Sequence, residues 1–133
     1  MPFRADDQHI REAMALTAGM ITMIDDQIGR VVQTLKDTGQ YDNTIIIFTS
    51  DHGDYLGDFN MMLKGPLPLC AITRVPLIWS DPDRRTAVRA DTMASTIDIS
   101  ASILDRVGMA PYNGMQGRSF LGALDGTQPH RDE

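Results

Sequence analysis

The most regular hydrophobic pattern of the chain lies in its first third and predicts a long helix. Mostly apolar residues recur there at alternating steps of four and three, which places them on one helical face: Ile10, Met14, Thr17, Ile21, Ile24, Ile28, Val31 and Leu35. Asp6 or Asp7 is suited to cap the start, and Gly39 stands where a helix ends on a left-handed residue. A coiled coil has the same spacing, but the pattern stops at Gly39, so we favour a single amphipathic helix.

An unbroken apolar run follows at residues 44–49 and predicts a buried β-strand. Its residues are β-branched or aromatic on both faces, which is typical of a central strand in a parallel sheet covered by helices. A second short strand is predicted at residues 75–79, with Pro76 at its start or on an edge, because proline has no N–H to donate. A second helix is predicted at about residues 96–107, with Gly108 as its stop. The fold class is therefore α/β, a parallel sheet with flanking helices.

Two strands are too few for a stable sheet of this kind, because three or more strands with both faces covered are the usual minimum. We therefore expect residues 1–133 to be part of a larger α/β domain, incomplete as a stand-alone domain. Strands borrowed from a partner chain are the alternative. Exposed strand edges favour self-association, so we expect a homo-oligomer. Residues 127–133 are expected to form a disordered tail.

Composition narrows the class of function. A length of 133 residues suggests one domain at most, and the net charge of −6 argues against a nucleic-acid partner. The densest basic group is Arg84, Arg85 and Arg89, which we interpret as a solvated surface rather than an anion-binding patch. No apolar run reaches the roughly 18 residues of a membrane span, and the N-terminus lacks the pattern of a signal peptide. The cytoplasm is the default location, and the single Cys70 excludes an intrachain disulfide.

Candidate chemistry begins directly after the first predicted strand, at Asp51 and His52. Ligands of open parallel sheets bind outside the carboxyl ends of the strands. Neighbouring side chains of a regular strand point to opposite faces, so both reach one ion only if the backbone turns, which Gly53 allows. A carboxylate and a neutral imidazole together suit a divalent cation. The alternative is that Asp51 caps a turn and His52 is merely exposed. Asp54 and Asp58 are further candidates, each more simply interpreted as a solvated loop carboxylate.

Lys64 is the next candidate. Three apolar residues precede it and a Gly-Pro turn follows, so its ammonium group could sit in a lined pocket and hold an anion as a point charge. A surface lysine at a turn is the alternative interpretation.

Several spaced motifs, taken in their order, resemble the sulfatase family. They are residues 20–30, Asp42-Asn43-Thr44, Phe48-Thr49-Ser50-Asp51-His52-Gly53, residues 74–79, Ser95-Thr96-Ile97-Asp98-Ile99, Ser102-Ile103-Leu104-Asp105 with Gly108, and residues 115–120. The resemblance covers roughly residues 14 to 126. It implies an alkaline-phosphatase-like α/β fold and hydrolysis of sulfate esters, or of phosphonate or phosphate esters in close relatives. It implies Asp51 and His52 as metal ligands and Lys64 as the group that contacts the substrate's anion. The implied cofactor is a divalent metal ion, calcium first and manganese as the alternative.

The resemblance also implies a nucleophile, a cysteine or serine converted to formylglycine within Cys/Ser-x-Pro/Ala-x-Arg. We expect none in this chain, which alone is predicted to be inactive. Cys70-Ala71-Ile72-Thr73-Arg74 has arginine at the right distance, but Ile72 stands where proline or alanine belongs. Cys70 is instead interpreted as a buried or semi-buried structural thiol. The N-terminal aspartate pair that completes the family's metal shell is missing as well, and the loop before Arg74 lacks a glutamate that many relatives carry. A non-catalytic, degenerate binding or oligomerisation module is the alternative function.

Overall fold

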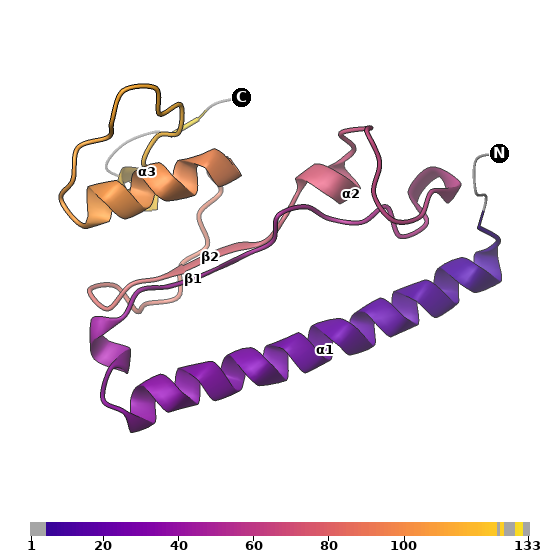
Figure 1. Cartoon of the computed structure of the whole chain (residues 1–133), viewed down its shortest axis with the longest axis horizontal. Helices are drawn as coiled ribbons and strands as arrows, with labels where there is room; N and C mark the ends of the chain where they lie inside the picture. The colour runs from indigo at the N-terminus through magenta and orange to yellow at the C-terminus, as the bar shows by residue number, and fades with distance from the viewer. Residues whose placement is uncertain (1–4, 125, 127–129, 132–133) are drawn as a thin grey trace. The chain divides into compact units, whose positions relative to one another are not determined.

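The structure is a computed structural model that describes residues 5–124, 126 and 130–131. It divides into two compact units, Met1–Arg85 and Thr86–Glu133. The first unit contains α1 (Asp7–Asp37), η1 (Tyr41–Asn43), β1 (Ile46–Thr49), η2 (Asp58–Asn60), α2 (Cys70–Thr73) and β2 (Leu77–Ser80). The second contains α3 (Thr96–Arg106) and α4 (Leu121–Leu124). Figure 1 shows α1 as one long helix and β1–β2 as a narrow pair of strands.

The long first helix is confirmed almost to the residue. The Asp6 side chain accepts a hydrogen bond of 2.9 Å from the amide of His9 and so caps α1. Gly39, just past the helix, has a φ of +68°, the left-handed conformation that glycine adopts at low cost. None of the helix's 31 residues is buried, although its apolar stripe is as predicted. Large side chains such as Ile21 and Met23 stay 61% exposed.

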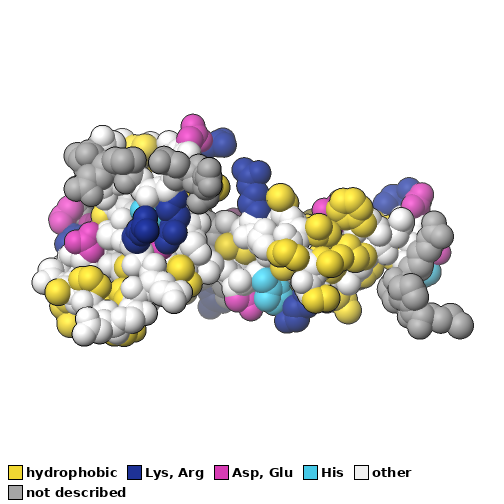
Figure 2. Space-filling view, turned by 90° about the horizontal axis from the view of Figure 1, so that it is seen from above, with side chains coloured by type: hydrophobic (Ala, Val, Ile, Leu, Met, Phe, Trp, Pro, Cys, Tyr) yellow, Lys and Arg dark blue, Asp and Glu magenta, His cyan; other side chains and the backbone are white. Residues whose placement is uncertain are grey.

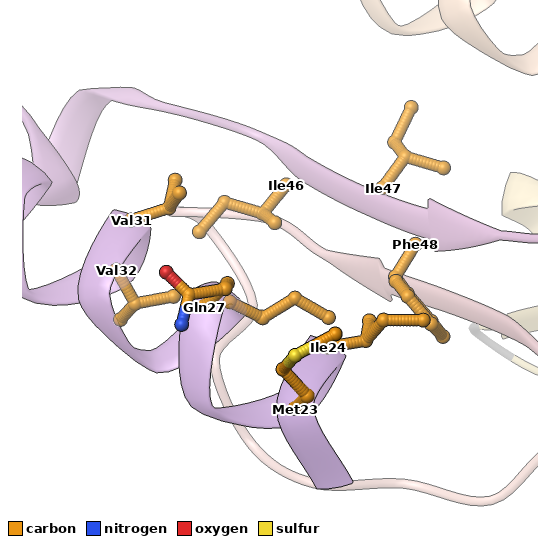
Figure 3. A pocket seen from close by; sticks show the side chains of 9 residues that line it. Met23, Ile24, Gln27, Val31, Val32, Ile46, Ile47 and Phe48 are labelled. Carbon is orange, nitrogen blue, oxygen red and sulfur yellow. The ribbon is translucent and has the colours of Figure 1, made fainter. Parts of the chain in front are cut away.

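The apolar stripe of α1 faces β1 across an open groove of about 420 Å³. Its lining comes from Met23, Ile24, Gln27, Ile28, Val31, Val32, Ile46, Ile47 and Phe48. Figure 3 shows Ile46 and Phe48 directed from the strand toward the helix, while Ile47 points to the other face, as alternation along a strand requires. Apolar side chains of both elements therefore line a groove that no other described residue fills.

The expected parallel sheet is wrong for these two strands, because β1 and β2 pair antiparallel. The register joins Ile46 to Ser80 and Thr49 to Leu77. A parallel pair needs a crossover that returns the chain to the same end of the sheet, normally through a helix of several turns. The connection here contains only the short elements η2 and α2, and it leads the chain directly back along β1. Pro76 stands just before β2, where its missing N–H breaks no ladder bond.

Arg85 fastens the start of β1 to the end of β2, so it does not belong to a solvated basic surface as expected. Its guanidinium carbon lies 3.8 Å from the centroid of the Tyr41 ring. The guanidinium donates 2.9 Å to the Ser80 hydroxyl, 3.2 Å to the Thr44 carbonyl, and also to the Tyr41 carbonyl. A planar cation that stacks on a ring and donates to several oxygens is a role that lysine could not fill.

In the second unit, α3 agrees with the predicted second helix, and Gly108 beyond it has a φ of +71°. The core of this unit is small. It consists of Asp98, Ala101 and Ser102 from α3 and of Phe120, which is 2% exposed. Of the predicted tail, residues 127–129 and 132–133 lie outside the described residues, whereas His130 and Arg131 are described and bind Asp98. No helix among the described residues has the length and apolarity to cross a membrane.

Candidate functional site

The candidate site lies where the chain leaves β1. The Ser50 hydroxyl donates to the carbonyl of His52 at 2.9 Å, and the amide of His52 donates to Oδ1 of Asp51 at 2.9 Å. These local bonds bend the backbone at once after the strand. As a result the second carboxylate oxygen, Oδ2 of Asp51, lies 3.5 Å from Nε2 of His52. The structure therefore brings the two candidate ligands to the same side, as the turn at Gly53 predicted.

The ring of His52 is oriented by its own neighbour. Its Nδ1 lies 2.7 Å from the carbonyl oxygen of Gly53. Because a carbonyl only accepts, Nδ1 carries the proton and Nε2 presents a lone pair. A backbone carbonyl that fixes the tautomer in this way is the usual support of a metal-binding histidine.

Gly53 is needed for a close approach to α2. Its amide donates to the carbonyl of Ile72 at 2.8 Å, and a Cβ at this position would lie 1.8 Å from the carbonyl oxygen of Ala71. A backbone atom cannot yield as a flexible side chain would. The short helix α2 therefore backs the loop that carries Asp51 and His52, and only glycine permits this contact.

Lys64 is positioned at the site by a loop that its own backbone hydrogen bonds close. Backbone bonds join Tyr55 to Leu63 and Gly57 to Met61, each at 2.8 Å. Tyr55 is 4% exposed, and its hydroxyl donates 2.9 Å to the carbonyl of Leu67 while accepting 3.2 Å from the Leu67 amide. The loop carries four non-glycine residues with positive φ, namely Leu56, Phe59, Asn60 and Leu63. Such strain persists only where surrounding bonds enforce it, and it collects at functional sites.

Lys64, the third predicted site residue, meets the other two. Its Nζ donates to Nε2 of His52 at 2.9 Å. The hydrogen bond from the His52 amide lowers the pKa of Asp51, so this carboxylate stays charged. Asp51 is largely solvated, with a side chain that is 84% exposed. The site is an open corner on which a carboxylate, an imidazole and an ammonium group converge. Figure 2 shows a group of hydrophobic side chains on one face of the chain, with histidine atoms at its edge.

The donor set fits part of a divalent-metal shell. Two ligands at right angles around a cation with bonds of about 2.4 Å stand about 3.4 Å apart, close to the observed separation of Asp51 and His52. Within the described ranges, no three histidine, cysteine or acidic side chains converge as a complete cluster. The described residues of this corner therefore offer two ligands to an ion that normally takes six or more.

The structure also shows where the two weaker candidates, Asp54 and Asp58, and the Cys70 thiol lie. Asp54 accepts from the amide of Leu56 at 2.8 Å and Asp58 begins η2; both are exposed, as expected of loop carboxylates. Cys70 is exposed as well, so the expectation of a buried or semi-buried thiol is wrong. It is the first residue of the one-turn helix α2, whose inner side contacts Gly53 through the backbone rather than through this side chain.

A literal match to the nucleophile pattern was missed in the sequence. Ser80-Asp81-Pro82-Asp83-Arg84 fits Cys/Ser-x-Pro/Ala-x-Arg, and scanning the printed sequence for the pattern alone would have found it. The register places Ser80 opposite Ile46, at the end of the sheet away from Thr49 and Asp51. At about 3.3 Å per residue, three strand residues separate it by roughly 10 Å or more from the site. Its hydroxyl accepts from Arg85, so this serine belongs to the turn after β2 and not to the site.

Solved structures show the class of fold. The chain superposes on a phosphonate monoester hydrolase from Agrobacterium radiobacter with a TM-score of 0.79 and 37% identity, over 86% of this chain and 23% of that one. A phosphonate monoester hydrolase from Silicibacter pomeroyi gives 0.82 and 38%, over 96% and 25%. A similar relative is a multifunctional alkaline phosphatase superfamily protein, PehA of Trinickia caryophylli, 38% identical over 93% of this chain and 24% of its own length. These likenesses place the chain in the alkaline phosphatase superfamily.

The family follows from a further match. The family model named Sulfatase matches residues 3–109 of this chain. An arylsulfatase of Clostridium perfringens is 35% identical over 87% of this chain and 25% of its own length. The chain belongs to the sulfatase family, as its spaced motifs predicted. It spans about a quarter of the length of these two relatives.

Proposed function

We propose that this chain supplies the metal-ligand and anion-binding corner of a sulfuric or phosphonic ester hydrolase. Asp51 and His52 would each give one ligand to a divalent cation, and Lys64 would hold the anionic group of the ester. One observation carries the proposal: Lys64 Nζ and Asp51 Oδ2 approach the same nitrogen of His52, at 2.9 and 3.5 Å. These three groups come from two loop segments, and the closed loop at residues 55–63 brings Lys64 to His52.

The chemistry of the three groups supports these roles. Asp51 is charged and His52 presents a lone pair from a tautomer fixed by the Gly53 carbonyl. A bound cation would polarise the ester's anionic oxygens, as divalent ions generally do in ester hydrolysis. Lys64 would neutralise charge that grows on those oxygens in the transition state. Sulfatases typically depend on a divalent metal; calcium is our first expectation and manganese the alternative, since oxygen and nitrogen donors together admit both.

The proposed substrate class rests on the names of similar proteins and not on the geometry of the site. Similar proteins bear the names arylsulfatase and phosphonate monoester hydrolase. We therefore propose a sulfate or phosphonate monoester as the substrate of the whole enzyme. Its nucleophile, expected as formylglycine, would come from outside these 133 residues, because Ser80 lies away from the site and Cys70 does not fit the pattern. The isolated chain is then inactive.

The second candidate is a non-catalytic, degenerate member that uses this region for binding or oligomer contacts. It is favoured by the exposed apolar stripe of α1 and the open groove against β1. Self-association through free strand edges belongs to this candidate too. The gene upstream of Met1 discriminates between the two functions. A Cys/Ser-x-Pro/Ala-x-Arg segment there supports the hydrolase, and a genuine start codon at Met1 without such a segment rules it out.

The metal role has a direct test on the chain itself. The chain contains three histidines, so titration with Mn²⁺ can be followed by paramagnetic broadening of each ring signal separately. We expect weak binding, with dissociation constants of about 1 mM, that broadens the His52 ring first because two ligands fill only part of the shell. Asp51→Asn should abolish the effect, whereas Asp54→Asn, at an exposed carboxylate of the same loop, should preserve it. Equal broadening of all three rings, or binding that survives Asp51→Asn, would refute the site.

A further inference from the structure

Asp98 is the most enclosed charged group among the described residues. Its side chain has no exposed surface, and its two oxygens accept five hydrogen bonds. Oδ2 accepts from the Ser95 amide at 2.8 Å, from Nε2 of His130 at 3.0 Å and from Nε of Arg131 at 2.9 Å. Oδ1 accepts from the Arg118 amide at 2.9 Å and from a terminal nitrogen of Arg131 at 2.6 Å. A buried carboxylate is tolerated only with such complete pairing.

These donors gather parts of the chain that are distant in sequence. Ser95 caps α3, while Arg118, His130 and Arg131 lie 20, 32 and 33 residues beyond Asp98. Residues 117–124 together with His130 and Arg131 are named the strap here. The strap belongs to the second unit, whereas Asp51, His52 and Lys64 belong to the first.

A second set of contacts holds the strap against α3. The Phe120 amide donates to the Ser102 hydroxyl at 3.0 Å, and that hydroxyl donates to the Asp98 carbonyl at 2.8 Å. A Cβ on Gly117 would lie 2.1 Å from the Ile97 carbonyl oxygen, so the backbone itself touches the helix there. The His130 ring stands edge-on to the Phe120 ring, with centroids 6.3 Å apart.

We propose that the strap closes on α3 as one cooperative unit and that Asp98 is its lock, with His130 and Arg131 as the locking groups. Residues of the strap lie beyond residues 3–109, which the sulfatase family model matches, although Asp98 lies within that range and the similar motif at residues 115–120 reaches into the strap. Opening the lock uncovers the Phe120 ring and the buried side of α3. On this proposal the strap, which follows the segment matched by the family model, is part of the folded structure of the second unit.

The strap can be tested by amide hydrogen exchange on the full chain. The amides of Arg118 and Phe120 have side-chain acceptors on α3, and they report the closed strap. Asp98→Asn keeps the shape of the lock and removes its charge. Arg131→Met keeps the stem of a side chain that is 24% exposed and leaves α3 untouched, so it serves if Asp98→Asn fails to fold. Asp91→Asn is the matched control, because Asp91 pairs with Arg89 at 3.4 Å on the surface, with both side chains almost 90% exposed.

We expect Asp98→Asn and Arg131→Met to speed exchange of both reporter amides about tenfold or more, because several charge-assisted bonds are lost together. Interior amides of α3 should change little in Arg131→Met, and Asp91→Asn should change neither group. Unchanged protection of Arg118 and Phe120 in Arg131→Met overturns the lock. Equal loss of protection in the strap and in α3 of that variant overturns the strap as a separate unit.

Discussion

The ammonium group of Lys64 donates to Nε2 of His52 across 2.9 Å, so the lysine holds the lone pair that a metal ion would need. Both cannot use that nitrogen at once. A cation that binds Asp51 and His52 must displace Lys64, and the displaced ammonium group is then free to meet an anion. Metal binding and anion binding at this corner are expected to reinforce each other for this reason.

Removal of the Lys64 charge should therefore strengthen metal binding. Lys64→Met keeps most of the stem and deletes a positive charge that competes with the proposed ion. Two unit charges about 4 Å apart interact by about 1 kcal/mol in water, which corresponds to about a fivefold gain in affinity. Mn²⁺ titration with His52 ring broadening as the signal measures it. Lys36→Met is the control, since Lys36 lies over the Tyr41 ring, 5.1 Å from its centroid. Weaker binding in Lys64→Met would show that the lysine supports the metal ligands rather than competing with the ion.

Gly53→Ala should damage the loop that carries the site. The added Cβ would lie 1.8 Å from the Ala71 carbonyl oxygen, so either the loop or α2 must move. We expect a loss of about 2–4 kcal/mol in the free energy of unfolding, as for other forced overpacking and lost backbone bonds. Gly19→Ala is the matched control in α1, where nothing lies within 4 Å, and it should stabilise by about 0.5–1 kcal/mol. Urea unfolding monitored by circular dichroism gives both values, and similar effects would contradict the close approach.

Leu63→Gly should be tolerated better than the same change at a neighbouring leucine. Leu63 has a φ of +64° and is 71% exposed, so glycine relieves strain and sacrifices little burial. Leu67, 50% exposed and not among the described residues with positive φ, gains no such relief. The two variants share the entropy cost of glycine in the unfolded chain, so their difference isolates the strain. We expect Leu67→Gly to be less stable than Leu63→Gly by about 1 kcal/mol in urea unfolding, and the reverse order would disprove strain at Leu63.

Acid should weaken the second unit through Asp98. Burial raises the pKa of this carboxyl group, but the bonds from Arg131, the Arg118 and Ser95 amides and His130 outweigh it and hold the pKa well below its ordinary value of 3.8. The stabilisation is therefore fully present above the unfolded pKa and is lost as the pH falls toward the folded one.

The stability difference between the native chain and Asp98→Asn follows this dependence. It should be about 3 kcal/mol near pH 5 and shrink below about pH 4, because the unfolded native chain then takes up a proton at Asp98 that the folded chain does not yet bind. Native Phe120 ring signals, recorded against urea at each pH, provide the measurement. A difference that stays constant down to about pH 2 would mean that the charge of Asp98 contributes nothing.

The helices were predictable because their signals are local. Asp6 and Gly39 bracket α1 and Gly108 ends α3, and each acts within a few residues of the helix terminus. Strand direction was not predictable in this way, because it depends on the path of the whole connection between β1 and β2. A buried-looking apolar run predicted a parallel neighbour, yet the neighbour that forms is antiparallel.

Asp51, His52 and Lys64 were named from the sequence, and their roles stay a prediction. The structure adds that the three side chains meet. Asp51 and His52 are adjacent in sequence, so a turn at Gly53 was enough to bring them together. The local pattern marked Lys64 only as an anion-binding candidate, because no local signal tells that a loop closed at Tyr55 and Leu63 returns the lysine to His52. The lock at Asp98 was missed since its donors lie 20 to 33 residues away, and the local pattern marks Asp98 only as an acidic residue in the first turn of a helix.

Cys70 offers a single site for covalent labelling close to the candidate site. The thiol is the sole cysteine and is exposed, and the next residue's carbonyl presses against Gly53, beside His52. A maleimide fluorophore or nitroxide attached to Cys70 would label the chain at a single position on α2, the helix that contacts Gly53 behind the proposed metal site. Occupancy of Asp51 and His52 could then be watched optically or by electron spin resonance, with no engineered mutation at all.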